Sequence, residues 1–340
     1  LGIEPAELVY NAEYCGGGFG SKATPNPIMA VPGLMTRKIG RPEMMRINRS
    51  EEYLLGSDRH SLQGYLKLGF NEDGRVVAAV IFCLQANGAY EGFPDFMNSA
   101  EVVGACYTPE AIRFRGVPVL TNTPTAGAQR GPGQNQMACI VEPIMDKAAA
   151  ELGIDRLALR QVNAPTDGAV IGSRQTTMTS AYLADALKMA AAEFNWEERK
   201  LRSRQRQGSK VTGIGIGSAM HPAGFSGFDG LVRILPDGKL YIHTGVGNLG
   251  TYSYAATSRI AAEVLKYDWE DCVIIRGDSS KHLPWNSIQA GSNTSFTQSR
   301  TNYVAAMDAV AKLKEIAAMD LGGSADDYEI DGRRVFRRSN

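Results

Sequence analysis

The sequence lacks several patterns that would assign it at once. No stretch of its 340 residues approaches the roughly 20 consecutive apolar residues that a membrane-spanning helix needs, so no membrane span is expected. Its five cysteines are far apart with no C-x-x-C pair, and its four histidines are isolated. This dispersion argues against zinc, an iron–sulfur cluster or a disulfide framework in the chain. We therefore expect no metal ligands among its side chains and a reducing, cytoplasmic location.

The chain also has no excess of charge of either sign. Lysine plus arginine and aspartate plus glutamate number 36 each, which gives a formal net charge of zero. A neutral chain offers no basic surface for nucleic acid or an acidic membrane, so neither partner is expected. The first residues, "LGIEPAEL", contain no methionine, and we expect the true start of the protein to lie upstream.

Strand and helix patterns alternate along the chain. The apolar fraction of 44% and the charged fraction of 21% are typical of a globular protein. Periodicity and turn residues predict strands at 6–15, 43–49, 230–235, 239–245 and 272–277, hairpins at 65–90 and 328–338, and helices at 134–153, 183–194, 254–265 and 302–319. We interpret this order as an α+β (mixed α/β) fold with a first domain at 1–165, a connecting segment at 166–210 and a second domain at 211–340.

Residues 13–22, "EYCGGGFGSK", follow a predicted strand and gather four glycines around one phenylalanine. Glycine permits positive φ and a close approach of the main chain to a ligand. The loop does not fit the nucleotide patterns, because Lys22 is followed by alanine and the third glycine of G-x-G-x-x-G is missing. It is either a tight buried turn or part of a larger binding site.

Other segments favour the larger site. After the glycine loop come "RKIGRP", "NRSEEYL…RH", "QANGAY", "VLTNTPTAGAQRGPG" (119–133) and "HTGVGNLGTYSYAATSRIAAE" (243–263), in that order. Together with "CGGGFGSK", they resemble the molybdenum-binding subunit of the xanthine dehydrogenase and aldehyde oxidase family over almost the whole chain. The resemblance implies two molybdenum-cofactor-binding domains and a molybdopterin cofactor, either plain or as the cytosine dinucleotide. It also explains the missing ligand cluster, since the pterin and not the protein holds the metal.

The resemblance implies a set of site residues. An N–H of the glycine loop would face an oxo group of the metal, and the hydroxyl-rich stretch 291–297 would hold the pterin phosphate. The implied cofactor-binding residues are Gly17, Gly18, Phe19, Gly20, Arg130, Gly131, Gly250, Thr251, Ser292, Asn293, Thr294 and Ser295. The implied substrate-pocket residues are Gln129, Pro132, His221 and Phe225.

Four positions depart from the family pattern. Thr251 replaces the glutamine of the usual G-Q-G, which puts that contact with the pterin in doubt. Pro132 replaces the aromatic residue that sandwiches flat substrates. Ala23 and Asn98 stand where purine oxidisers carry charged residues, so xanthine is not the expected substrate.

The general-base glutamate of the family has no counterpart in the chain. Glu142 and Glu263 fall in predicted helices and are interpreted as structural, so we expect the base on another part of the protein or on another polypeptide. The resemblance implies oxidative hydroxylation of an aldehyde or N-heteroaromatic carbon with water as the oxygen source. It also implies a [2Fe-2S] subunit and an FAD subunit as electron-transfer partners, besides the remaining molybdenum-subunit polypeptide. A hydratase-type relative without net oxidation, and a non-catalytic paralogue that packs on an active copy, remain as alternatives.

Overall fold

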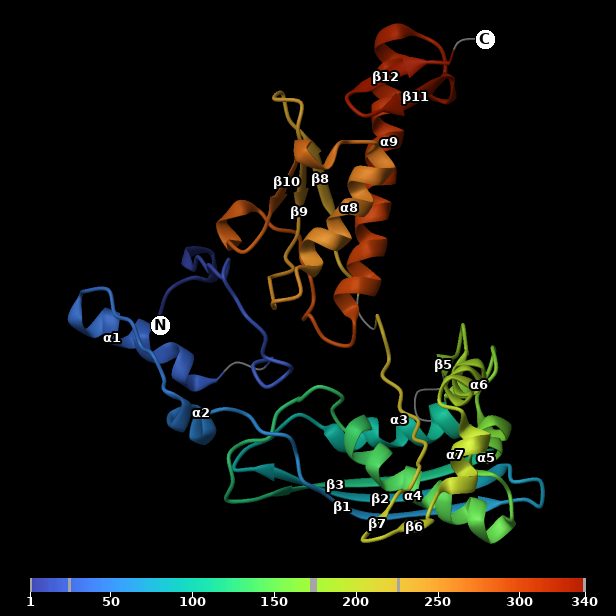
Figure 1. Ribbon diagram of the computed structural model, residues 1–340. Coiled ribbons are helices and arrows are strands. Elements are labelled where there is room, and N and C mark those ends of the chain that lie inside the picture. The colour runs from blue at the N-terminus through green and yellow to red at the C-terminus, as the bar shows by residue number, and fades with distance from the viewer. Residues whose placement is uncertain (1, 24–25, 172–175, 225–226, 339–340) are drawn as a thin grey trace. The chain divides into compact units, whose positions relative to one another are not determined.

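The computed structural model describes residues 2–23, 26–171, 176–224 and 227–338, and its chain divides into two compact units (Figure 1). The C-terminal unit comprises Leu1–Gly18, Pro27–Met44 and Pro222–Asn340, and the central unit comprises Phe19–Asn26 and Met45–His221. These units divide the chain by contacts, and its first 44 residues contribute to both. Such a division does not test the sequence boundaries expected at 165 and 210, which stay a prediction.

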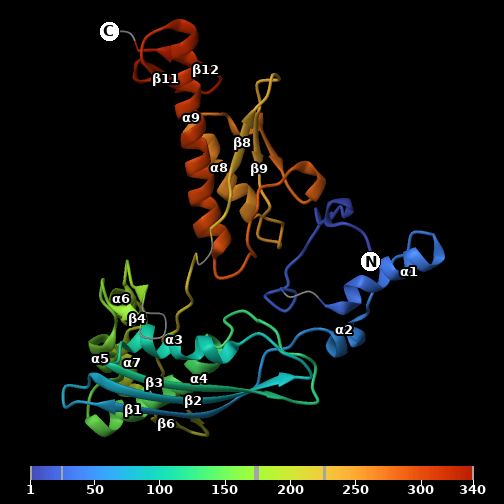
Figure 2. The ribbon, with the colours of Figure 1, turned by 180° about the vertical axis from the view of Figure 1, so that it is seen from behind.

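The central unit is built on a three-stranded sheet (Figure 2). Strands β1 (Leu62–Phe70) and β2 (Val76–Gly88) form the predicted antiparallel hairpin, and β3 (Ala111–Leu120) pairs with β2 in parallel. The turn of the hairpin closes at Gly74, whose φ of 81° is in the left-handed region that glycine adopts without strain. The other elements of the unit are α2 (Arg49–Leu55), α3 (Asp95–Tyr107), α4 (Gln134–Leu152), α5 (Arg156–Asn163), α6 (Leu183–Glu193) and α7 (Trp196–Arg202), with the two-residue strands β4 (Val170–Ile171), β5 (Thr176–Thr177), β6 (Arg206–Gln207) and β7 (Lys210–Val211).

Alternation along β2 places every second side chain in the core of this unit. Ala79, Ile81 and Cys83 are buried and pack with α3 and α4, while the residues between them are only partly buried. Helix α4 begins at Gln134. Gly153 caps its C-terminus with a left-handed φ of 67°. The core therefore fixes the position of the loop that precedes α4.

The C-terminal unit repeats the same order of elements. A hairpin of β8 (Leu231–Ile234) and β9 (Leu240–His243) is followed by α8 (Ser253–Leu265), then by β10 (Cys272–Ile275) parallel to β9, and then by α9 (Ser299–Leu321). The unit also contains α1 (Val31–Ile39), the hairpin of β11 (Tyr328–Asp331) and β12 (Arg334–Arg337), a π-helical turn η5 (Thr294–Gln298), and the short 3₁₀ turns η1 (Pro5–Glu7), η2 (Pro27–Ala30), η3 (Trp269–Asp271), η4 (Ser279–Lys281) and η6 (Ala325–Asp327).

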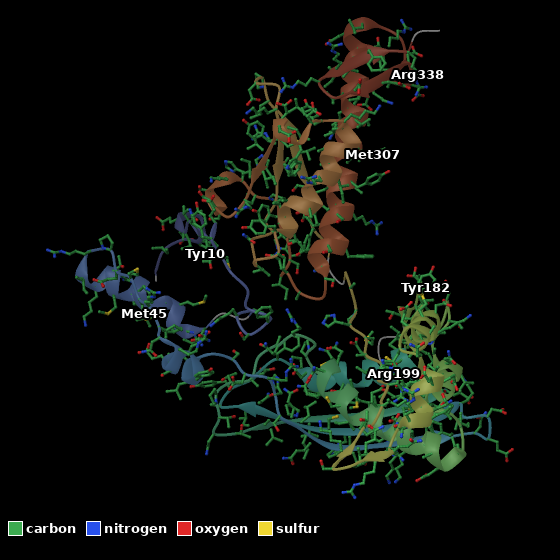
Figure 3. All side chains as sticks on the ribbon, in the orientation of Figure 1. Tyr10, Met45, Tyr182, Arg199, Met307 and Arg338 are labelled. Carbon is green, nitrogen blue, oxygen red and sulfur yellow. The ribbon has the colours of Figure 1, made fainter. Side chains whose placement is uncertain are left out.

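The helix α9 shows how this second core is made. Ala306 is fully buried against α8 and the sheet, whereas the neighbouring Met307, labelled in Figure 3, is 45% exposed. Both units thus have the order hairpin, helix, parallel strand, helix. The loop ahead of α4 and the loop ahead of α9 occupy the same place in this order. The sequence analysis predicts that both contact the cofactor.

Most predicted elements are confirmed, and two predicted strands are wrong. Within the described part of the chain, 6–15 has only the turn η1 and an isolated bridge between Asn11 and Asp278, and 43–49 leads into α2 without forming a strand. Both segments have residues of strand type but no ladder to join, and pairing is what stabilises a strand. None of the described helices combines the length and the apolarity that crossing a bilayer requires.

Candidate functional site

The loop 126–133 between β3 and α4, which we call the arginine loop, holds the end of the glycine loop closely. The N–H of Arg130 donates to the C=O of Phe19 at 2.7 Å. Gly20, with a φ of 109°, lies so near that an added Cβ would come within 2.5 Å of the C=O oxygen of Ala128. The structure therefore brings together two loops that are more than 100 residues apart in the sequence, and only glycine fits at their closest approach.

The side chains of these two loops also meet. The guanidinium of Arg130 lies 4.6 Å from the centre of the Phe19 ring, a cation–π distance. Phe19 is 59% exposed and has a φ of 53°, which is rare for a bulky residue. Backbone strain of this kind is concentrated at functional sites, where surrounding contacts maintain it. The aromatic residue among the glycines thus stacks on the arginine of the second loop.

Two of the four expected substrate-pocket residues, Gln129 and Pro132, lie on the arginine loop. Gln129 and Pro132 flank Arg130 and Gly131 and are partly buried. The C=O of Pro132 accepts a hydrogen bond from Nδ2 of Asn98 at 3.1 Å. Two of the positions that depart from the family pattern, Asn98 and Pro132, are therefore in direct contact with each other.

Gln289 links the hydroxyl-rich stretch 291–297 of the C-terminal unit to the loop 244–252, which lies between β9 and α8. Its Oε1 accepts the N–H of Gly247 at 3.0 Å, and its Nε2 donates to Oγ1 of Thr294 at 3.4 Å. The expected residues Gly250 and Thr251 follow Gly247 on one loop. Ser292, Asn293, Thr294 and Ser295 form the other loop, so all six predicted positions lie on two loops that Gln289 links.

Both loops end in the first turn of a helix. Tyr252 caps α8 and Asn293 caps η5, and neither cap has a side-chain hydrogen bond to the helix N–H groups. Free N–H groups at a helix N-terminus favour an anion. Thr251 donates to Oγ of Ser253 at 3.1 Å, so the hydroxyl that replaces the family's amide lies at the start of α8. These donors fit a phosphate group.

Four expected residues are not brought together by these contacts. Gly17 and Gly18 belong by contact to the C-terminal unit, although Phe19 and Gly20 belong to the central one. His221 is exposed at the end of the central unit. Phe225 lies outside the described residues. The roles of all the expected site residues stay predictions.

Glu142 has a structural environment, as expected. Its carboxylate forms an ion pair with Arg160 at 2.8 Å and accepts a hydrogen bond from the Tyr107 hydroxyl. The Arg160 side chain is fully buried and also lies 2.9 Å from Asp146. Burial and the Glu142 carboxylate raise the pKa of Tyr107, which keeps its hydroxyl a neutral donor. Glu263, the other expected structural glutamate, is exposed on α8.

No group of three or more potential metal-ligating side chains occurs among the described residues. Burial raises the pKa of Cys106 to about 12, and burial with the nearby Asp271 carboxylate raises that of Cys272 to about 11. Thiols of this kind stay protonated at neutral pH and are poor metal ligands. The donors that the site does offer are backbone N–H groups, hydroxyls and arginine. That set suits an anionic organic cofactor that carries its own metal.

Sequence reasoning missed Arg59 as well as Gln289. Arg59, on the segment before β1, donates to the C=O of Arg130 at 2.8 Å. The segment "NRSEEYL…RH" contributed to the resemblance, but no pattern within it indicated that its arginine contacts the arginine loop. Only the tertiary structure shows this contact.

The two units, each with a polar loop ahead of the helix that follows its parallel strand, have a mixed α/β fold. Residues 1–164 and residues 189–340 each match the molybdopterin cofactor-binding domain family. The chain therefore belongs to the molybdopterin cofactor-binding domain family over most of its length.

Individual relatives agree with this assignment. The chain is 27% identical over 322 residues to the xanthine dehydrogenase molybdenum-binding subunit of Escherichia coli O157:H7, covering 92% of this chain and 42% of that protein. It is 29% identical to an aldehyde oxidoreductase of Megalodesulfovibrio gigas, covering 79% of this chain and 31% of that protein. The fold matches the crystal structure of quinoline 2-oxidoreductase from Pseudomonas putida 86 with a TM-score of 0.88 and 23% identity, over 98% of this chain and 45% of that one. The chain thus spans less than half the length of each of these proteins.

Proposed function

We propose that this chain is the cofactor-binding part of a molybdenum hydroxylase. The proposed reaction converts an aldehyde or an N-heteroaromatic C–H and water into the hydroxylated product (a carboxylic acid from an aldehyde), two protons and two electrons. The observation that carries the proposal is the joining of the glycine and arginine loops, through the Arg130–Phe19 hydrogen bond and stack. These are the two loops that the family uses at its metal centre.

The donor set fits the cofactor in both units. In the central unit, Phe19, Gly20, Arg130 and Gly131 would lie against the metal end of the molybdopterin. In the C-terminal unit, taken by itself, the N-termini of η5 and α8 would suit a phosphate group. When bound, the cofactor supplies the two-electron oxidation, while the chain's residues position it and provide fixed donors where negative charge develops.

Some parts of the reaction must come from elsewhere. The proposed general base is a glutamate outside this chain, since Glu142 is held in its ion pair with Arg160. Electrons would leave through iron–sulfur clusters and FAD on partner subunits, because none of the five cysteines, all free, has cluster spacing. Free thiols also favour the proposed cytoplasmic location.

Turnover in ¹⁸O-labelled water tests this function. The intact complex that contains this chain would receive benzaldehyde or quinoline as a probe and a dye as the electron acceptor. We expect one labelled oxygen in the product for each two electrons that reach the dye. Addition of labelled water without reduction of the dye would favour the hydratase-type alternative, and no reaction with any probe would favour the non-catalytic one.

Pro132 should affect the choice of substrate. Replacing Pro132 with phenylalanine introduces the flat ring that the family uses against heteroaromatic substrates. We expect the ratio of kcat/KM for quinoline to that for benzaldehyde to rise by about tenfold, the lower range of a single pocket contact. Molybdenum content should stay near that of the unaltered complex. An equal loss of both activities and of molybdenum would show instead that Pro132 has a structural role.

A further inference from the structure

We propose that Arg59 is a positioning residue of the arginine loop and that it orients the Arg130–Gly131 peptide toward the cofactor. This inference rests on the proposed function for the identity of the ligand, but the contacts that carry it belong to the central unit alone. Arg59 lies before β1, more than 60 residues from the loop in sequence, and is partly buried.

Arg59 holds the loop by its backbone. Its Nη2 donates to the C=O of Arg130 at 2.8 Å, and its Nη1 lies 3.4 Å from the C=O oxygen of Gly131, also as a donor. Arg59 has no ion pair within the described part of the chain. Its acceptors on the arginine loop are two successive backbone carbonyls. A charged donor makes hydrogen bonds roughly twice as strong as a neutral one. The guanidinium therefore fixes the orientation of two consecutive peptide groups.

Gln136 fixes Arg59 in turn. Its Oε1 accepts from Nη1 of Arg59 at 3.3 Å and from the N–H of Gly133 at 3.0 Å. Its Nε2 donates to the C=O of His60 at 3.2 Å and to Oδ2 of Asp95 at 3.0 Å. A single amide in the first turn of α4 thus connects the arginine loop, α3 and the segment before β1.

The base of this network is buried. The side chains of Asp95 and His60 have no exposed surface, and His60 Nδ1 lies 3.1 Å from Asp95 Oδ2. An added Cβ on Gly133 would come within 2.0 Å of the C=O oxygen of Asp95, so the end of the arginine loop lies directly on α3. The hydrogen bond from Gln136 to Asp95 Oδ2 anchors the amide to this buried base, whereas His60 Nδ1, His60 Nε2 and Asp95 Oδ1 have no hydrogen-bond partner among the described residues.

The network determines the direction in which the N–H of Gly131 points. In a trans peptide the C=O and the next N–H point in opposite directions. Because Arg59 holds the C=O of Arg130, the N–H of Gly131 points away from Arg59, and it has no acceptor among the described residues. Neither Arg59 nor Arg130 is neutralised by a carboxylate within those residues. The loop therefore presents an oriented donor in a positive environment, which suits an anionic or oxo group.

The test compares three variants in the intact complex. Arg59→Met removes the donors and keeps the length of the side chain, and Arg59→Lys keeps one charged donor. Arg75→Met is the matched control, since Arg75 also binds a backbone carbonyl, that of Val162 at 2.7 Å, at the other end of β2. The measurements are amide hydrogen exchange of residues 127–133, molybdenum content, the Mo(V) electron paramagnetic resonance spectrum after dithionite reduction, and kcat and KM for benzaldehyde.

We expect Arg59→Met to speed exchange in 127–133 several-fold, to alter the Mo(V) spectrum and to lower kcat by about 10- to 100-fold with little change in KM, the range for a displaced positioning group. Arg59→Lys should recover most of this loss, and Arg75→Met should match the unaltered complex.

The proposal is overturned if Arg59→Met and Arg75→Met have the same exchange and spectrum, or if exchange rises equally across the whole unit. If Arg59→Met fails to accumulate, a wild-type exchange rate and spectrum in Arg59→Lys would support the proposal, and accelerated exchange throughout the unit would contradict it. If the unaltered complex holds no molybdenum, the proposed function fails, and the exchange comparison still decides the role of Arg59.

Discussion

Replacing Arg160 with methionine should lower the free energy of unfolding of the central unit by about 3–5 kcal/mol, the usual cost of removing one partner from a buried ion pair. The Arg160 side chain is fully buried and contacts the carboxylates of Glu142 and Asp146. It also donates to two backbone carbonyls, those of Arg156 at 3.1 Å and Glu142 at 3.2 Å. Methionine would fill part of the space but remove the buried cation, so that Glu142 would keep only the neutral Tyr107 donor and Asp146 only the longer contact with Arg156 at 3.5 Å.

An exposed ion pair in the same unit supplies the control for this prediction. Arg202 lies 2.6 Å from Glu198, and the two side chains are 74% and 61% exposed. Arg202→Met should cost less than about 1 kcal/mol, because water solvates the exposed Glu198 carboxylate that remains. Urea unfolding followed by the fluorescence of Trp196, which is buried in this unit, gives both values. Equal costs for the two variants would contradict the buried role of Arg160.

Replacing Gly20 with alanine should lower the molybdenum content of the complex by about tenfold or more, since each 1.4 kcal/mol of lost binding is a factor of ten. The φ of 109° at Gly20 costs a non-glycine residue about 1–3 kcal/mol by itself. The added Cβ would also lie 2.5 Å from the C=O oxygen of Ala128, a backbone atom that can move only with the arginine loop. Strain and clash together would separate the two loops proposed to bind the cofactor.

Gly16 provides a matched control in the same glycine loop. Its φ is not positive, and an added Cβ would meet no atom within 4 Å. Gly16→Ala should therefore load molybdenum as the unaltered chain does. If Gly20→Ala also loads normally, the close approach of the two loops does not matter for the cofactor.

Local patterns were enough to predict the elements that depend on neighbours in sequence. The hairpin of β1 and β2 follows from alternation and from Gly74, and α4 follows from its spacing and from Gly153. The strand β3 could not be predicted as a partner of β2, because a parallel pairing depends on the helix packed between them. The helix α3 was also missed. Its buried Asp95, Ser99 and Glu101 interrupt the apolar pattern, and only tertiary hydrogen bonds, such as Gln134 to Glu101 at 3.1 Å, satisfy them.

The candidate site was predicted to a similar extent. Glycines and hydroxyls between strands and helices indicated each loop separately, but their grouping came from a resemblance and not from spacing. The stack of Arg130 on Phe19, the link through Gln289 and the support by Arg59 all join residues far apart in sequence. Such contacts depend on the packing of whole elements, which a single sequence does not encode locally.

The central claim is that the loops of this chain hold a molybdopterin cofactor. Elemental analysis of the intact complex, together with chemical identification of the released pterin, tests it most directly. We expect molybdenum and pterin in equal amounts that approach one of each per chain, with the Gly16→Ala complex equal to the unaltered one and the Gly20→Ala complex depleted in both. A complex with neither molybdenum nor tungsten, and with no pterin, would contradict the account.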